Sequence, residues 1–232
     1  MELGPGEPAA GPWRVEPVEV FARTLAEAAG NPTGRPRIIA VDGRGGGGKT
    51  ALADRLSHHL GPAAVVHSDD VAWGHARFGW DDLMITGVLE PLRAGYPIHY
   101  RPPGWPPERP GHLNAPAGLA TVLIEGVGVS RRSLAPLVDV AVWIQSDYVE
   151  AKQRGVRRDL ADLGRTPAEA DRLWDEWEAE EVPFLEEDQP WLRAHVIVGT
   201  ASSLPHDPDT EVVVAEQGQR ASQPPSTGRT VP

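Results

Sequence analysis

The sequence predicts an α/β fold in which helices cover both faces of a mainly parallel sheet. Several short segments are continuous runs of apolar, often β-branched residues, which is typical of strands buried on both faces. Segments with apolar residues at helical spacing alternate with these runs. We therefore expect a three-layer α/β/α domain over residues 36–200, preceded by a tail and a helix over residues 1–35. A disordered tail is expected over residues 201–232, and no internal repeat is visible.

The expected elements can be placed along the chain from these patterns. The expected strands are Arg37–Val41, Ala63–His67, Thr121–Glu125, Val138–Ile144 and His195–Val198. The expected helices are Glu16–Ala29, Lys49–Leu60, Asp81–Ala94, Tyr148–Leu163 and Thr166–Glu187. Gly30 is suited to end the first of these helices, and Thr166 followed by Pro167 is suited to begin the last.

Three segments lack such patterns. Met1–Val15 is rich in Gly, Pro and Glu, and the chain from Ser202 onward is rich in Pro, Ser, Gln and Asp. Neither segment can bury much apolar surface, so both are expected to be disordered. The short Val212–Val214 run does not change this expectation. Tyr96–Pro116 is rich in proline and is expected to be a long irregular segment, a kind that is usually functional or disordered.

Composition excludes several classes of function. The formal net charge is −11, and a surface this acidic repels phosphate backbones, so we expect no nucleic-acid partner. A small anionic ligand needs only a local positive pocket. The chain has no cysteine, which excludes disulfides and thiolate metal sites and favours a reducing compartment. Neither a signal peptide nor a membrane-spanning apolar stretch is visible, so we expect a soluble, cytoplasmic protein with no membrane partner.

A glycine-rich segment between an expected strand and an expected helix fits the phosphate-binding pattern G-x-x-x-x-G-K-[ST]. Its residues are Gly43, Arg44, Gly45, Gly46, Gly47, Gly48, Lys49 and Thr50. Glycines let successive backbone N–H groups surround phosphate oxygens, and the helix start adds positive potential. Lys49 would neutralise phosphate charge, and the Thr50 hydroxyl would ligate Mg²⁺. A flexible linker is the alternative, but the flanking strand and helix favour a P-loop that binds ATP and Mg²⁺.

Carboxylates follow two of the expected strands. Glu125 ends one strand, where an acidic residue of a P-loop enzyme holds or orients the Mg²⁺ shell. An ordinary charged residue at a strand end is the alternative, and the flanking Gly126 and Gly128 favour the functional role. Ser68-Asp69-Asp70 follows another strand. Side chains at this edge of an α/β sheet point into the ligand crevice. One aspartate could accept a proton from an attacking hydroxyl while the other helps to organise Mg²⁺. A turn or a helix cap is the alternative.

Arginines gather on the expected helix after the fourth strand. Arg154 and Arg158 are four residues apart and share a helix face, and Arg157 lies beside them. Guanidinium groups can stabilise charge on a transferring phosphoryl group. The alternative is a solvated helix surface on which the arginines pair with Glu150 and Asp162.

Together these motifs resemble the uridine kinase and phosphoribulokinase group of P-loop kinases, from about Arg37 to Val198. VDGRGGGGKT resembles the P-loop of the group, and TVLIEGVGV resembles the segment with the magnesium-associated glutamate, here Glu125. VVHSDDVAW resembles the second-strand segment, which implies that Asp69 is the base and that Asp70 is its neighbour near the metal. AKQRGVRRDL resembles the start of the mobile lid, which implies phosphate contacts from Arg154 and Arg158.

The resemblance implies a small-molecule kinase that uses ATP and Mg²⁺. Asp69 would activate a hydroxyl of a nucleoside or similar polyol, and Lys49, Arg154 and Arg158 would stabilise phosphoryl transfer. A non-catalytic nucleotide-binding or regulatory protein derived from such a kinase is the alternative. A GTPase is disfavoured because the sequence has no Asn-Lys-x-Asp motif.

One part of the family pattern is missing. Uridine kinases carry a Tyr-Asp pair in the substrate segment, and that pair would fall near Pro103 and Gly104. Its absence removes expected sugar contacts and weakens the case for uridine itself. Nearby polar and aromatic residues could form a different pocket, or they could pack the proline-rich segment; they are His99, Tyr100, Arg101, Trp105 and Arg109.

Overall fold

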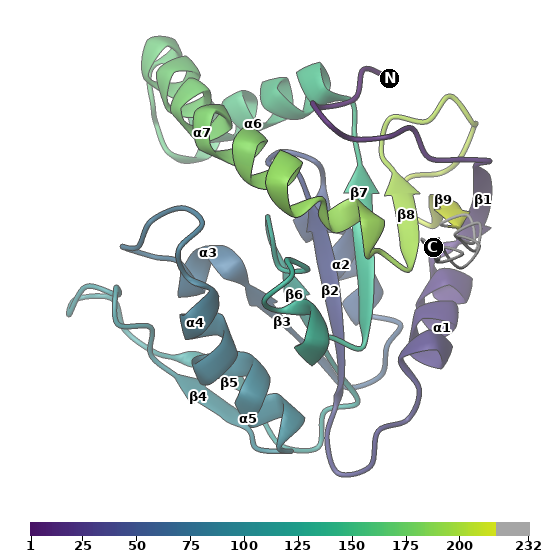
Figure 1. Ribbon diagram of the computed structural model, residues 1–232, viewed down its shortest axis with the longest axis vertical. Helices are drawn as coiled ribbons and strands as arrows, with labels where there is room; N and C mark the ends of the chain where they lie inside the picture. The colour runs from purple at the N-terminus through teal and green to yellow at the C-terminus, as the bar shows by residue number, and fades with distance from the viewer. Residues whose placement is uncertain (217–232) are drawn as a thin grey trace, which may run out of the picture.

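The computed structural model describes residues 1–216 and has a seven-stranded sheet at its centre, with helices on both faces (Figure 1). The strands are β1 Arg14–Pro17, β2 Arg37–Gly43, β3 Ala63–His67, β4 Ile98–Tyr100, β5 Leu113–Ala115, β6 Thr121–Glu125, β7 Val140–Gln145, β8 Val196–Gly199 and β9 Glu211–Glu216. The α-helices are α1 Val18–Ala29, α2 Lys49–Ser57, α3 Ser68–Val71, α4 Asp81–Met84, α5 Glu90–Arg93, α6 Tyr148–Asp162 and α7 Pro167–Asp188. A π-helical turn, Ile85–Leu89, joins α4 to α5, and short 3-10 turns lie at Ala135–Leu137 and Pro190–Leu192. Across residues 1–216, no helix combines the length and apolar character that crossing a bilayer requires.

The centre of the sheet is parallel, as the sequence predicts. The strand order is β1-β9-β8-β7-β2-β6-β3, and every neighbouring pair from β8 to β3 runs in parallel. Ligands of open α/β sheets bind at the carboxyl ends of such strands. In this sheet that edge carries the ends of β2, β3, β6 and β7, which are Gly43, His67, Glu125 and Gln145.

Both faces of the central strand β2 are buried, which explains its unbroken apolar sequence. Ile39 and Val41 belong to the core cluster that α1 and α2 cover. Ile38 and Ala40 point to the opposite face, into a cluster covered by residues 81–93. Because side chains of a strand alternate between faces, residues 38–41 in the middle of a strand covered on both sides are all apolar.

The described segments on both sides of residues 36–200 are more ordered than the sequence predicts. β9 lies in the segment expected to be a disordered tail, and it pairs antiparallel with both β8 and β1. Val212, Val213 and Val214 are almost completely buried. A three-residue apolar run cannot fold alone, but here an existing sheet edge supplies its partner. The expected boundaries at residues 36 and 200 are therefore too narrow, and the part of the predicted tail over residues 217–232 lies outside the described residues.

The N-terminal residues, also expected to be disordered, pack on the carboxyl end of β7. Glu7 is buried and accepts hydrogen bonds from Trp143 Nε1 at 2.6 Å and from Gln145 Nε2 at 3.0 Å. The Ala10 backbone N–H donates to Gln145 Oε1 at 3.0 Å. These contacts join residues more than 130 positions apart, so local composition could not reveal them.

The proline-rich segment is also more regular than expected. β4 and β5 form a short antiparallel hairpin, and between them the chain turns through the prolines. Trp105 is mostly buried, and the Arg109 guanidinium lies 3.8 Å from the centre of its ring. The same guanidinium contacts Trp73 at 5.0 Å. Trp105 and Arg109 therefore pack the segment, which was one of the two alternatives that the sequence left open.

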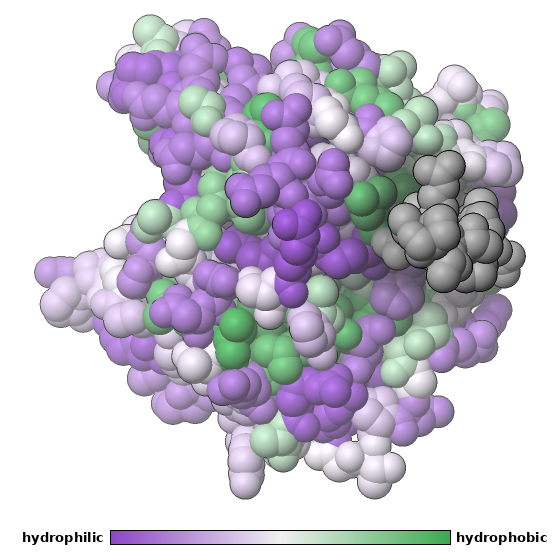
Figure 2. All heavy atoms as spheres, viewed as in Figure 1, coloured by the Kyte–Doolittle hydropathy of each residue, from purple (hydrophilic) through white to green (hydrophobic). Residues whose placement is uncertain are grey.

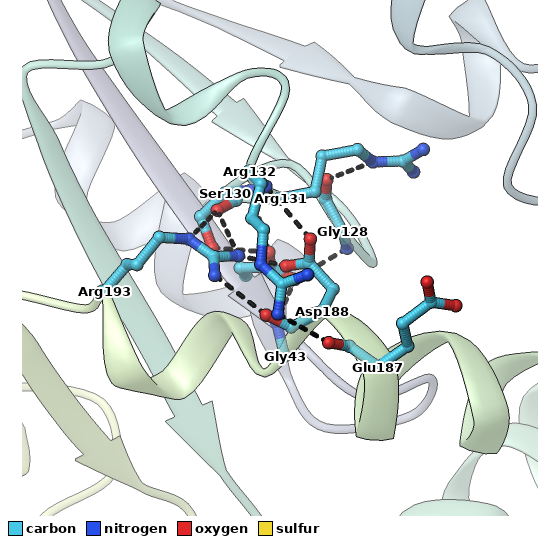
Figure 3. A network of polar contacts seen from close by, with 9 residues as sticks. Gly43, Gly128, Ser130, Arg131, Arg132, Glu187, Asp188 and Arg193 are labelled. Atoms are coloured by element: carbon cyan, nitrogen blue, oxygen red, sulfur yellow. Dashed lines mark hydrogen bonds and ion pairs between the residues drawn. The ribbon is translucent and has the colours of Figure 1, made fainter.

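A buried carboxylate joins the end of β2 to the loop after β6. Asp42 is fully buried and accepts hydrogen bonds from the backbone N–H groups of Gly43, Gly128 and Ser130, and from the Ser130 hydroxyl, at 2.7–2.8 Å. The pKa of Asp42 is raised, because the effect of burial outweighs these hydrogen bonds, which lower it. Asp188 and Arg193 extend the network toward the end of α7 (Figure 3). The network fixes the loop that follows Glu125.

Replacing the buried carboxylate should destabilise the protein. Asp42→Asn keeps the shape but offers one accepting oxygen, so buried N–H donors lose their partners at about 1–3 kcal/mol each. We expect the free energy of unfolding, measured by urea denaturation, to fall by about 2–4 kcal/mol. Asp171→Asn, on an exposed position of α7, is the control and should change it by less than about 0.5 kcal/mol. Equal values for the two variants would contradict this role for Asp42.

Removing β9 should also destabilise the protein. A chain that ends at Ser203 lacks the buried valines of β9, and each buried valine side chain contributes about 1.5 kcal/mol or more. We expect its free energy of unfolding to be lower by at least about 3 kcal/mol than that of a chain ending at Glu216. The same stability for both chains would show that β9 adds nothing to the sheet.

Candidate functional site

The predicted P-loop connects β2 to α2 in the expected way. Gly46 and Gly48 adopt positive φ angles of 69° and 101°, which glycine tolerates best. A Cβ on Gly46 would lie 2.0 Å from the Ala151 carbonyl oxygen at the start of α6. Lys49 is buried, and its Nζ donates to the Arg44 carbonyl oxygen at 2.9 Å. The loop therefore folds around its own lysine and packs tightly against α6.

Arg44, the second residue of the P-loop, turns toward the N-terminal segment. Its Nε donates to Glu7 Oε2 at 3.3 Å, and its Nη2 donates to the Pro5 carbonyl oxygen at 2.9 Å. The side chain is almost completely buried. The sequence places Arg44 among the nucleotide-binding residues, and in this structure its side chain anchors the loop to residues 5–7.

A cavity of about 310 Å³ opens beside the P-loop. It is lined by Gly45, Gly46, Lys49, Thr50, Asp69, Arg77, Glu125, Gly126, Val127, Arg158, Asp159, Arg165, Leu173, Trp174 and Trp177. The space-filling view shows the outline hollowed between the α6–α7 pair and the region around α3 and α4 (Figure 2). The cavity therefore brings together side chains from the P-loop, the ends of β3 and β6, and the helix pair.

Thr50 and Glu125 form a possible site for a divalent ion. The Thr50 hydroxyl donates to Glu125 Oε1 at 3.3 Å, and both residues line the cavity. Such hard oxygen ligands suit Mg²⁺, which keeps several waters and phosphate oxygens in its shell. No cluster of three or more His, Cys, Asp or Glu in residues 1–216 could hold a metal. The protein thus supplies a partial shell that fits an ion brought in with phosphate oxygens.

His67 was not predicted to belong to the site. Its Nδ1 lies 2.6 Å from Glu125 Oε1, because His67 and Glu125 are opposite each other in the β3–β6 register. This hydrogen bond raises the pKa of His67, although partial burial opposes the change. His67 therefore orients the Glu125 carboxylate. Sequence reasoning missed it because neighbouring strands in this sheet are not consecutive in the chain.

The structure separates the two aspartates that follow β3. Asp69 lines the cavity, whereas Asp70 forms an ion pair with Arg109 of the proline-rich segment. Gly126 allows the β6 loop to approach this turn, since a Cβ there would lie 1.7 Å from Ser68 Oγ. The structure does not bring Asp70, predicted as a metal neighbour, to the cavity, because its carboxylate is held by a guanidinium from another element.

The lid arginines differ in their surroundings. Arg154 Nε donates to the Gly46 carbonyl oxygen at 3.1 Å, and within residues 1–216 its buried Nη2 has no hydrogen-bond partner. A buried donor beside a P-loop fits an anionic ligand. Arg158 lines the cavity and forms an ion pair with Asp159 at 3.3 Å. Arg157 is exposed and is not among the residues that line the cavity.

Helix α7 supplies cavity residues that the sequence analysis did not single out. Trp174 and Trp177 line the cavity, and Glu181 is buried against the P-loop. Glu181 Oε1 accepts a hydrogen bond from the Gly45 backbone N–H at 2.7 Å. These three residues are spaced three and four apart, so they share a helix face, a signal that the sequence does contain. What the sequence does not reveal is that this face meets the P-loop.

Comparisons with known proteins support the fold. No family model and no curated protein sequence matches the chain. A "putative fructose transport system kinase" from Silicibacter sp. TM1040 aligns with 76% of this chain and 95% of its own, at 18% identity and a TM-score of 0.57. D-glycerate 3-kinase from Cryptococcus neoformans aligns with 78% of this chain and 92% of its own, at 13% identity and a TM-score of 0.50.

A possible uridine kinase from Bacillus stearothermophilus also aligns, at 19% identity over 78% of this chain and 96% of its own, but its TM-score of 0.46 is too low to carry an argument. Identities below 20% speak for the arrangement of the elements, not for the substrate. The chain therefore has the fold of the P-loop kinases, the group that its sequence motifs resemble.

Proposed function

We propose that this protein is an ATP-dependent small-molecule kinase that transfers the γ-phosphate to a hydroxyl group of a nucleoside or similar acceptor. The proposal rests on the position of Asp69 between two adjoining cavities. The larger cavity contains the P-loop, and a smaller one of about 170 Å³ is lined by Ser68, Asp69, Ala72, His75, Arg77, Trp80, Val127 and Trp177. A phosphate donor and a hydroxyl acceptor could thus lie on the two sides of one carboxylate.

The residues of the larger cavity suit the phosphate donor. Lys49 and the backbone N–H groups of the loop would bind phosphate oxygens. Arg154 is not among the residues that line the cavity, but it contacts Gly46 of the loop and would add its Nη2, which has no hydrogen-bond partner within residues 1–216. Thr50 and Glu125 would hold Mg²⁺, which neutralises phosphate charge when it is bound. These groups stabilise negative charge where it develops during transfer, which is the main requirement of phosphoryl-transfer catalysis.

Asp69 is suited to the role of general base. Its carboxylate would take the proton of the acceptor hydroxyl while the oxygen forms a bond to the γ-phosphorus. The bond between that phosphorus and the bridging oxygen breaks, and ADP leaves with the released electron pair. Trp174, Trp177 and Leu173 would cover the cavity and help to exclude water, which would otherwise act as the acceptor.

The acceptor is a compact molecule with free hydroxyl groups in this proposal. The smaller cavity has aromatic walls, Trp80 and Trp177, and polar groups at His75 and Arg77. The names of the two proteins with similar folds mention fructose and D-glycerate. Both compounds are small and carry several hydroxyl groups. Because the Tyr-Asp pair of uridine kinases is missing, a nucleoside is only one of several hydroxyl compounds that the proposal includes as acceptors.

A non-catalytic nucleotide-binding protein is the second candidate. The observation in its favour is that Glu181 already accepts a hydrogen bond from the P-loop at Gly45. A protein that only senses nucleotide would need the P-loop but not the carboxylate of Asp69. Acceptor-dependent release of ADP, screened over nucleosides, sugars and hydroxy acids, distinguishes the two candidates.

Lys49 should be required for nucleotide binding. Lys49→Ala removes the buried cation of the P-loop, and a charge-assisted contact with phosphate is among the stronger polar interactions. We expect the affinity for Mg²⁺-ATP, measured by calorimetry, to fall by about tenfold or more. Lys152→Ala is a matched control, because this other lysine is bound to Asp175 and Glu178 on the helix surface. Unchanged ATP affinity and turnover in Lys49→Ala would refute the assignment.

Asp69 should affect turnover more than binding. Asp69→Asn keeps the shape of the side chain and removes its basicity, so turnover should fall by about 10²–10⁴-fold while ATP affinity changes little. Steady-state assays of ADP release check the rate, and calorimetry checks binding. Asp70→Asn separates the two neighbours: a large loss of turnover there, with none in Asp69→Asn, would make Asp70 the base.

A further inference from the structure

The P-loop already holds an anion that belongs to the protein. Glu181, near the end of α7, places Oε1 2.7 Å from the Gly45 backbone nitrogen. The side chain is only 2% exposed, so water does not compete for this contact. Backbone N–H groups of a P-loop ordinarily face phosphate oxygens. A carboxylate carries the same charge sign and the same kind of accepting oxygen as a phosphate.

The surroundings of Glu181 match those of a phosphate group. The pKa of Glu181 is raised above its ordinary value, because burial outweighs the Gly45 hydrogen bond and the positive charge of Lys49, which lower it. Trp177 and Arg44 act in the same direction as Lys49. The groups that would stabilise a bound phosphate are therefore the groups that oppose the effect of burial on Glu181.

Glu181 and a nucleotide phosphate cannot both use the Gly45 N–H. A backbone N–H has one hydrogen to donate, and two anions at this distance from each other repel strongly in a buried site. We propose that Glu181 is an internal competitor for the phosphate site, which holds the empty P-loop and leaves it when a nucleoside triphosphate binds. This inference rests on the proposed nucleotide binding.

Release of Glu181 would also change the acceptor side of the cavity. Glu176 and Glu180 precede Glu181 on α7. Arg77 donates to the Glu176 carbonyl oxygen at 2.5 Å and to Glu180 Oε1 at 2.7 Å. Arg77 lines both cavities. A shift of α7 at Glu181 would therefore also move the hydrogen-bond partners of Arg77.

The first test is the affinity of a Glu181→Gln variant for the non-hydrolysable triphosphate AMP-PNP with Mg²⁺. Glutamine keeps the size of the side chain and removes its charge, and a neutral hydrogen bond is about half as strong as a charged one. Calorimetry should show binding about tenfold tighter than in the wild type. Glu187→Gln is the control, since Glu187 lies on the same helix α7 and its side chain is exposed; this variant should bind AMP-PNP within about twofold of the wild type.

The second test uses the wild-type protein and does not depend on the folding of a variant. Hydrogen exchange of the backbone around residues 178–185 should become faster when AMP-PNP and Mg²⁺ saturate the protein, because Glu181 no longer ties the helix to the P-loop. Exchange in α1, which lies on the other side of the sheet from residues 81–93, should stay the same.

The outcomes separate this inference from the proposed function. If the wild type binds AMP-PNP, Lys49→Ala loses binding and Glu181→Gln binds like the wild type, the proposed function stands and the competitor role is wrong. Unchanged or slower exchange at residues 178–185 on binding leads to the same conclusion. If neither the wild type nor Glu181→Gln binds AMP-PNP, both proposals fail together.

Discussion

The site depends on the buried carboxylate of Asp42. It accepts hydrogen bonds from the start of the P-loop at Gly43 and from the loop after β6 at Gly128 and Ser130. That link supplements the β2–β6 ladder and the Thr50–Glu125 hydrogen bond, which also join the phosphate-binding loop to the segment that carries Glu125. A charge this deeply buried is tolerated because donors surround it. The link helps to hold Thr50 and Glu125, the two residues proposed to share one ion, near each other.

Two further carboxylates hold the P-loop from opposite directions. Glu7 of the N-terminal segment pairs with Arg44, and Glu181 of α7 accepts from Gly45. Both are buried, and both come from segments far from the loop in sequence. Side chains of the protein itself therefore help to fix the shape of the loop. The Glu7 contact uses the side chain of Arg44, which does not line the cavity, so it can persist when a ligand binds. The Glu181 contact uses the backbone N–H of Gly45, which a phosphate would also need.

The parts of the fold that the sequence predicts are those encoded locally. The buried strands show unbroken apolar runs because both of their faces are covered, and the P-loop is a contiguous motif. Gly126 illustrates a local signal with a spatial meaning, since its missing side chain lets the β6 loop approach Ser68. β9 and the N-terminal segment were missed because their partners are remote. Val213 and Glu7 are stabilised by β8 and β7, and nothing in their own neighbourhoods indicates this.

The difference between local and remote contacts also explains why some predicted site residues lie at the cavity and others do not. Lys49 and Asp69 follow directly from the ends of strands or the start of a helix, so their positions at the cavity could be expected. Asp70 has the same local context as Asp69 but is turned by Arg109, 39 residues away. Glu181 is 136 residues from Gly45. Predicting such pairs requires knowing which surfaces of the fold meet, and a single sequence does not specify that.

The cations around the cavity explain how so acidic a chain can offer a site to a triphosphate. Asp159 is buried and forms ion pairs with both Arg158 and Arg165, and Arg77 is paired with Glu180. Asp159 thus offsets one of the two positive charges of Arg158 and Arg165, Glu180 offsets that of Arg77, and the chain as a whole carries a net charge of −11. A phosphate ligand would bind here by exchanging partners with these carboxylates, not by long-range attraction. Such exchange favours a ligand that can engage several cations at once, because only the combined contacts compensate for the ion pairs that are given up. A triphosphate with its metal ion meets that condition, whereas a single monoanion does not.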